Sequence, residues 1–141
     1  MNRALRRLWP LLVLAVGCHA SGTWVDDQAN WQRAFGQQLP PGVSLVRSWY
    51  WRSPHFFREE AYYFAISAPL AVETSLREEN HMTLVPLEHR GDLASSSCFT
   101  RPDWFPAQDS EQFQVWLSAS RGAALYHQPQ ESVFYVSVCR L

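Results

Sequence analysis

Apolar and polar residues alternate with a period of two in several segments of the chain, which predicts a domain rich in β-structure. Two aromatic segments, 43–52 and 62–67, are expected to pair as antiparallel strands across a polar-aromatic loop. A shorter β-like piece covers 82–85. A C-terminal meander of three strands is expected over 112–118, 123–128 and 132–139.

Two further segments show the three-and-four spacing of a helix. Thr23 and Asp26 form a start similar to a capping box, which predicts a helix over 24–35. Proline in the first turn favours a second helix over 69–80. The segment 112–118 also suits a helix face capped by Asp109, although a strand is preferred there. The sequence therefore predicts a single small α+β domain, mainly one antiparallel sheet of about five strands with two helices on one face.

Alternation along the paired strands predicts which aromatic side chains are buried. One set is expected to build the core: Trp49, Trp51, Tyr62 and Phe64. Tyr50 and Tyr63 lie at the alternate positions and are expected to face outward.

The N-terminus has the three-part plan of a secretory signal. Three arginines precede an apolar stretch from Leu8 to Val16, and small residues follow at Gly17 and Ala20. A helix of this length reaches about 14 to 17 Å, roughly half of the ~30 Å hydrocarbon layer. We therefore expect residues 1–17 to be a signal peptide and 18–141 to be the mature domain.

The end of this signal, Leu14-Ala15-Val16-Gly17-Cys18, resembles a bacterial lipobox. The resemblance implies cleavage before Cys18, diacylglycerylation of its thiol and acylation, for example with palmitate, of the new amino terminus. Two or three acyl chains hold a domain at a bilayer where one chain binds only marginally. The residues after the cysteine, His19 and Ala20, include no acidic retention signal, which by analogy favours the outer membrane. The alternative is ordinary signal cleavage after Ala20, which yields a soluble periplasmic protein.

Lipidation or removal of Cys18 leaves two cysteines, Cys98 and Cys139. In an oxidising compartment the simplest expectation is a disulfide between them. It closes a loop of about 42 residues, for which chain entropy gives a stabilisation on the order of 4 kcal/mol. Two buried, reduced cysteines are the alternative. A catalytic role for Cys98 is disfavoured because nothing nearby resembles a cysteine hydrolase.

Composition and charge narrow the class of protein. The 141 residues are 47% hydrophobic and 18% charged, which suits one globular domain. Loss of residues 1–17 leaves nine arginines against thirteen acidic residues, a net charge of about −4. The chain contains no lysine and no basic run, so we expect neither a nucleic-acid partner nor a polybasic membrane patch.

Motifs for catalysis or metal binding are not evident in the sequence. His81 and His89 stand eight residues apart, which fits no familiar metal-ligand spacing. Solvated surface side chains are the preferred interpretation of all five histidines: His19, His55, His81, His89 and His127. No nucleophile elbow, phosphate loop or dinucleotide fingerprint occurs. We therefore assign no catalytic residue, metal ligand or cofactor, although a carboxylate pair that meets only in the folded protein stays open.

Two aromatic pairs are candidates for partner binding. Phe56 and Phe57 lie in the loop between the first two strands and could grip a protein, glycan or lipid surface. Trp104 and Phe105 stand between two prolines shortly after Cys98, so a restricted loop could present them as a hot spot. Packing within the domain is the preferred interpretation for both aromatic runs.

These features favour a non-enzymatic lipoprotein of the cell envelope, anchored in the membrane through Cys18 and facing the periplasm. Its domain is expected to bind a protein or an envelope component. The main alternative is a soluble periplasmic inhibitor or immunity-type protein that inserts its Trp104-Phe105 loop into a target. A small hydrolase that uses a carboxylate or histidine pair is the least favoured of the three.

Overall fold

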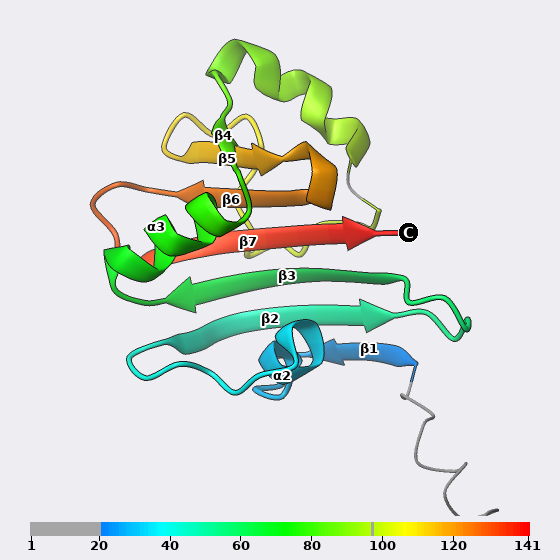
Figure 1. The fold of residues 1–141 in the computed structure, drawn as a ribbon. Helices are drawn as coiled ribbons and strands as arrows, with labels where there is room; N and C mark the ends of the chain where they lie inside the picture. The colour runs from blue at the N-terminus through cyan, green and yellow to red at the C-terminus, as the bar shows by residue number, and fades with distance from the viewer. Residues whose placement is uncertain (1–20, 97) are drawn as a thin grey trace, which may run out of the picture.

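The computed structural model describes residues 21–96 and 98–141, which form one small domain built on a seven-stranded sheet (Figure 1). The predicted signal peptide, residues 1–17, and Cys18 lie outside the described residues. The strands are β1 (Gly22–Val25), β2 (Ser44–Arg52), β3 (Glu60–Ser67), β4 (Thr83–Leu84), β5 (Gln114–Ser118), β6 (Ala123–His127) and β7 (Val133–Arg140). They are all antiparallel, in the order β1-β2-β3-β7-β6-β5-β4. The α-helices are α2 (Asn30–Phe35) and α3 (Leu70–Glu79), and the 3₁₀ segments are η2 (Leu87–Ser96) and η3 (Ala119–Arg121).

The prediction of an antiparallel α+β domain is confirmed, but the expected number of strands is too low. The sheet has seven strands rather than about five, because β1 and the short β4 extend its two edges. The helix 70–79 and the three C-terminal strands lie within two residues of their predicted bounds. The segment 114–118 is a strand, so the alternative of a helix capped by Asp109 is wrong.

The predicted helix over 24–35 is wrong in its first half. Residues 22–25 form β1 and pair with β2, and the helix begins only at Asn30. Asp26 has a φ of 51° and turns the chain after β1. Its carboxylate accepts hydrogen bonds from the Arg47 Nε and the Ser48 backbone N–H, both at 3.0 Å. The residue that looked like part of a helix cap therefore fastens β1 to β2.

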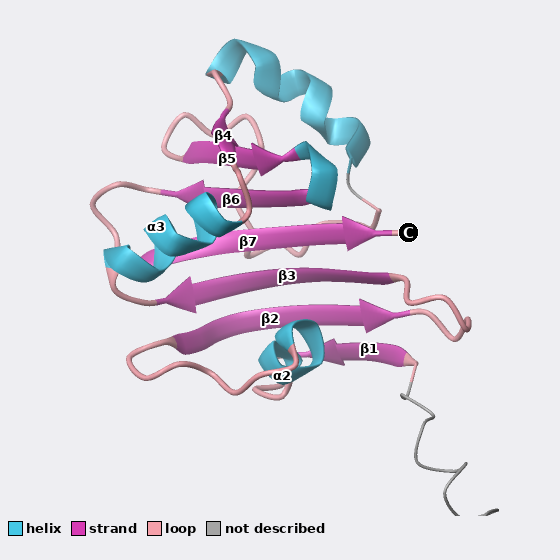
Figure 2. Cartoon of the chain, in the orientation of Figure 1, coloured by secondary structure: helices cyan, strands magenta, loops and turns pink. Residues whose placement is uncertain are grey.

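Both α-helices lie on one face of the sheet, as predicted (Figure 2). Trp31, Ala34 and Phe35 of α2 and Val72 and Leu76 of α3 pack into the core on this face. The sheet contributes its largest buried side chains to the same core: Tyr50, Tyr62, Phe64, Ile66, Leu125, Phe134 and Val136.

The opposite face is covered by the segment that leads from Cys98 to β5. Phe105 packs there against Tyr63, Val115 and Tyr126, with Trp49, Trp104, Phe113 and Tyr135 partly buried around them. The sheet is thus buried on both faces, which leaves few of its aromatic side chains in water.

The predicted allocation of aromatic side chains between the two faces is only half right. Tyr62 and Phe64 are in the helix-side core, but Tyr50 joins them there and is fully buried. Trp49 lies on the other face with Tyr63, which is itself buried. The cause is a register shift in β2 between Leu45 and Arg47. A bulge adds one residue to one strand, and this reverses the facing of every residue after it.

In the described part of the chain, no helix has the length and apolarity needed to cross a bilayer.

Candidate functional site

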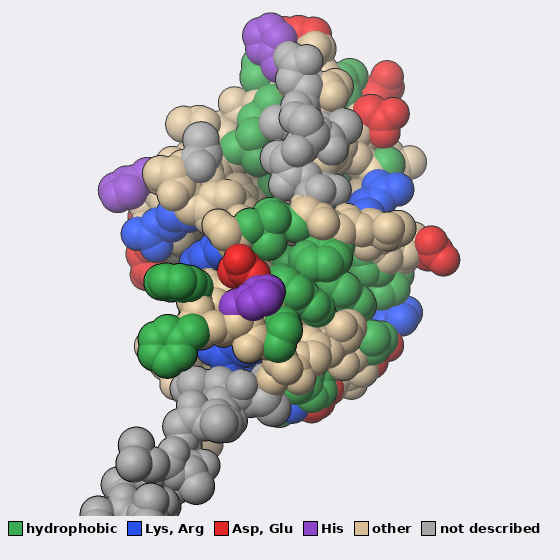
Figure 3. Space-filling view, turned by 90° about the vertical axis from the view of Figure 1, so that its right-hand side faces the viewer, with side chains coloured by type: hydrophobic (Ala, Val, Ile, Leu, Met, Phe, Trp, Pro, Cys, Tyr) green, Lys and Arg blue, Asp and Glu red, His purple; other side chains and the backbone are tan. Residues whose placement is uncertain are grey.

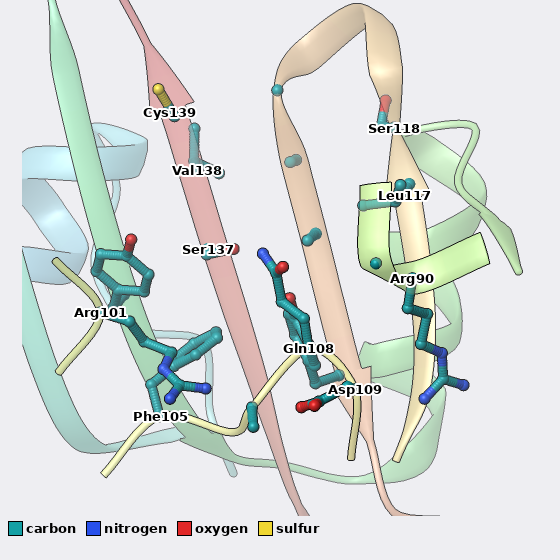
Figure 4. Close-up of a pocket in the computed structure, with 17 residues that line it drawn as sticks. Arg90, Arg101, Phe105, Gln108, Asp109, Leu117, Ser118, Ser137, Val138 and Cys139 are labelled. Carbon is teal, nitrogen blue, oxygen red and sulfur yellow. The ribbon is translucent and has the colours of Figure 1, made fainter. Parts of the chain in front are cut away.

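A cavity of about 460 Å³ opens on the loop-covered face of the sheet (Figure 4). Its floor is formed by the end of β7 and by β6 and β5, and its rim by residues 101–109 and by Arg90 and Gly91 of η2. The volume lies in the range of sites that hold a small molecule or a single large side chain of a partner. We take this cavity as the candidate functional site.

Small residues form the floor and aromatic residues form the wall. Gly122, Ala123, Ala124 and Ser137 line the floor, so a bound group could approach the sheet backbone closely. The wall contains the aromatic rings of Tyr63, Phe105 and Tyr126. Gly122 has a φ of 57° and a Cβ there would collide with the Cys139 carbonyl oxygen, so this turn requires glycine.

Two arginines lie on opposite sides of the cavity, with Gln108 standing between them (Figure 4). Arg90 is buried, and its guanidinium donates hydrogen bonds to the Ser110 carbonyl at 2.9 Å and to the Val85 carbonyl at 3.3 Å. It therefore holds the rim in place. Arg101 is exposed at the opposite side and is available to an acidic or hydroxyl-bearing partner.

The hydroxyl groups of Ser118 and Tyr126, two of the lining residues, differ in their access to the cavity. The Ser118 Oγ is buried and finds no hydrogen-bond partner in the structure, but it does not open into the cavity. Ser118 pairs with Ala123, and its side chain lies with Ala123 on the helix side of the sheet. Burial raises the pKa of the Tyr126 hydroxyl to about 12, while a hydrogen bond with Gln108 acts in the opposite direction. Tyr126 thus keeps its proton at neutral pH.

The cavity offers hydroxyl groups, an amide and guanidinium groups over an apolar floor, an arrangement suited to binding. The sequence patterns do not single out Arg90 or Arg101. No sequence signal could have found them, because they come together only when β5 and the rim fold over β7. Among residues 21–96 and 98–141, no group of three or more His, Cys, Asp or Glu side chains is placed to hold a metal ion.

A second hollow, of about 280 Å³, contains the pair Glu73 and His127. The prediction that His127 is a solvated surface residue is wrong, since its side chain is buried on β6. Its Nδ1 lies 3.7 Å from the Glu73 Oε1, and its Nε2 lies 3.2 Å from the Glu131 carbonyl oxygen. Glu73 is also held by the Arg77 Nε at 2.7 Å. Both imidazole nitrogens face protein atoms, so this pair fastens α3 and the β6–β7 turn to the sheet.

The structure brings Cys98 and Cys139 together at disulfide-bonding distance, with Cα atoms 5.9 Å apart. Cys98 starts the segment that covers the second face, and Cys139 lies near the end of β7 and lines the cavity. Phe99 follows immediately and packs against Trp49 and Trp51, at ring-centroid distances of 5.4 and 4.6 Å. The cysteine pair therefore fixes one end of the cavity rim to the sheet.

The two predicted aromatic pairs occupy different environments. Phe105 is buried among Tyr63, Tyr126 and Tyr135, while Trp104 is partly buried below the Arg47 guanidinium. This placement agrees with packing of Phe105 against the sheet. Phe56 and Phe57, by contrast, are exposed on the β2–β3 loop.

Comparison with protein-family models, with curated proteins and with solved structures finds no match for this chain.

Proposed function

We propose that this chain is a lipid-anchored protein of the cell envelope whose domain binds a protein or another envelope component at the cavity and does not act as an enzyme. The observation that carries the proposal is the proximity of Cys98 and Cys139. Once these two cysteines pair, Cys18 is the one cysteine of the sequence that remains, and it stands at the position that a lipobox modifies. A disulfide that closes a long loop also suits a protein exported to an oxidising compartment.

The geometry of the cavity supports binding as its role. Its floor of small residues admits close contact with a bound group. Arg101 at the rim favours a partner group that carries a carboxylate or several hydroxyls. The protonated Tyr126 hydroxyl adds a further polar group at neutral pH.

The anchor is tested by metabolic labelling with a fatty-acid analogue in cells that express the wild-type chain or the Cys18→Ser variant. We expect labelling of the wild type alone. Intact mass of the mature protein should show loss of residues 1–17 and addition of acyl groups, and reduction should restore two hydrogens to the cysteine pair. An unlabelled wild-type chain cut after Ala20 would replace this proposal with the soluble periplasmic alternative.

Binding at the cavity is tested by photo-crosslinking in living cells. A photoreactive amino acid in place of Arg101 lies at the rim, whereas one in place of the exposed Ser75 lies on α3, on the opposite face of the sheet. We expect a discrete adduct from position 101 and none from position 75. Identical patterns from both positions, or no adduct from either, would contradict binding at this site.

A further inference from the structure

The β2–β3 loop, residues 53–59, exposes two adjacent aromatic side chains. Phe56 is fully exposed and Phe57 is 81% exposed, although each ring is among the largest apolar groups in the chain. Exposed large apolar groups placed side by side mark contact sites more often than single ones do.

Hydrogen bonds hold this loop in a defined shape. The Ser53 backbone N–H donates to the Glu59 carbonyl at 3.0 Å, and the Glu59 N–H donates to the Phe57 carbonyl at 3.0 Å. The Ser53 Oγ, on a buried residue, donates to the same Phe57 carbonyl at 3.4 Å. The two rings are therefore presented by an ordered loop, which lowers the conformational entropy that binding must remove.

The loop lies at the end of the sheet where the chain enters β1. Gly22, the first residue of β1, pairs with Arg52, the last residue of β2. Gly22 follows Cys18 by four positions in the sequence, and four steps along the chain span at most about 14 Å. A lipid on Cys18 would thus keep this end of the domain close to the bilayer.

The same end of the sheet carries a further apolar residue and several basic ones. β7 ends opposite the start of β3, where Arg140 pairs with Glu60, and the following Leu141 is 77% exposed. Arg58 and Arg140 both bind the buried Glu60, yet about half of each side chain remains in water. Figure 3 looks onto this end and shows hydrophobic side chains that stand out from the surface, with basic, acidic and histidine side chains around them.

We propose that the 53–59 loop inserts Phe56 and Phe57 into the interface of an anionic phospholipid bilayer, while Arg58 and Arg140 contact lipid phosphates. The inference rests on the proposed function only for the identity of the bilayer, which is the one that anchors Cys18. Aromatic rings beside guanidinium groups form the usual composition of an interfacial membrane segment. The loop acts as a second attachment point and fixes the orientation of the domain on the membrane.

The first test uses the full chain with Cys18→Ser, so that no acyl chain contributes. Its partition onto vesicles of phosphatidylethanolamine and phosphatidylglycerol is measured by co-sedimentation at millimolar lipid. We expect Phe56→Ser/Phe57→Ser to lower the partition coefficient about tenfold or more. The control Leu70→Ser/Leu84→Ser removes two exposed leucines from other parts of the domain and should change it less than twofold. Equal partition of the loop variant and its parent would overturn the proposal.

The second test places an environment-sensitive dye on Phe57→Cys in the acylated chain, reconstituted in vesicles that contain brominated lipids. Quenching is expected at position 57 and not at Leu84→Cys on the β4 edge. If the chain is acylated but the dye at position 57 is not quenched, the proposed lipid anchor stands and the proposed membrane insertion of the loop is overturned. Capture of a protein partner by the loop, without partition of the chain onto vesicles, would overturn the insertion as well. If the chain is not acylated but partitions onto vesicles through Phe56 and Phe57, the proposed lipid anchor is overturned and the proposed membrane insertion of the loop stands.

Discussion

Glu60 provides the sharpest test of how the end of the sheet near the β2–β3 loop is held together. Its carboxylate is fully buried at the first residue of β3. The Oε2 accepts hydrogen bonds from the Tyr50 hydroxyl at 2.9 Å and from the Arg58 Nε at 3.0 Å. The Oε1 accepts one from the Arg140 Nη1 at 3.0 Å. Glu60→Gln keeps the shape of the side chain but removes its charge and one of its two acceptor oxygens.

The expected loss of stability follows from these contacts. A hydrogen bond to a charged group contributes about 1.5–3 kcal/mol when it is buried. Arg58 and Arg140 are about half exposed, so water replaces part of what each loses. The ionised carboxylate also carries a desolvation cost that glutamine does not. In Glu60→Gln the new amide N–H₂ faces a guanidinium donor. We therefore expect the free energy of unfolding to fall by about 2–3 kcal/mol.

Urea unfolding of the oxidised protein, followed by tryptophan fluorescence, measures this loss. Glu59→Gln changes the neighbouring charge outside the buried cluster and should alter stability by less than about 0.5 kcal/mol. A double-mutant cycle with Tyr50→Phe isolates the contact between the hydroxyl and the carboxylate. The reasoning is refuted if Glu60→Gln is as stable as the wild type, because the desolvation of the carboxylate would then outweigh its three hydrogen bonds.

The disulfide pair, the turn at Gly122 and the buried Tyr126 hydroxyl each allow a further test. Replacement of both Cys98 and Cys139 by serine should lower the free energy of unfolding by about 4 kcal/mol, as measured by urea unfolding without reductant. An unchanged urea midpoint would mean that the two cysteines are not bonded. Gly122→Ala should lower the free energy of unfolding, measured in urea, by more than about 2 kcal/mol, because the new Cβ collides with the Cys139 carbonyl oxygen. The control Gly36→Ala has a similar positive φ but no atom within 4 Å of the new Cβ, so it should lower the free energy of unfolding by only about 1 kcal/mol. Since burial raises the pKa of Tyr126 to about 12, the stability that this group contributes is complete below its ordinary pKa near 10 and is lost as the pH rises toward 12. Urea midpoints between pH 8 and 11 should therefore fall less steeply for Tyr126→Phe than for the wild type.

The strands that the sequence predicts correctly are those in which alternation continues over five or more residues. β2, β3 and the C-terminal meander are of this kind, because a period of two is a local property of the chain. β1 has only four residues, and its Trp24 also fits the helical spacing of the residues that follow. Asp26 was expected to cap a helix, but its side chain bonds Arg47 and Ser48, more than twenty residues away. A contact at that distance along the chain leaves no local pattern.

The facing of side chains was harder to predict than the strands that carry them. Up to Leu45 the alternation in β2 assigns faces correctly, but the register shift before Arg47 reverses the assignment for Trp49 and Tyr50. One extra residue in one strand has no signature in composition. The sequence also gave no sign that the second face would be covered, and an uncovered face would have left Tyr63 in water.

The cysteine pair connects the proposed location of the protein with the integrity of its candidate site. Cys98 begins the segment that supplies Arg101 and Phe105 to the cavity, and Cys139 belongs to the strand that forms part of its floor. Without a bond between the two cysteines, this segment still packs on the sheet through Phe105, but its start is held mainly by Phe99. The Phe99 ring packs on Trp49 and Trp51, and its carbonyl accepts a hydrogen bond from the Tyr63 hydroxyl at 3.1 Å. The rim is therefore held most firmly when the disulfide forms, and disulfides form in oxidising compartments. The proposed export of the chain would therefore also supply the condition under which the rim of the cavity is fixed covalently.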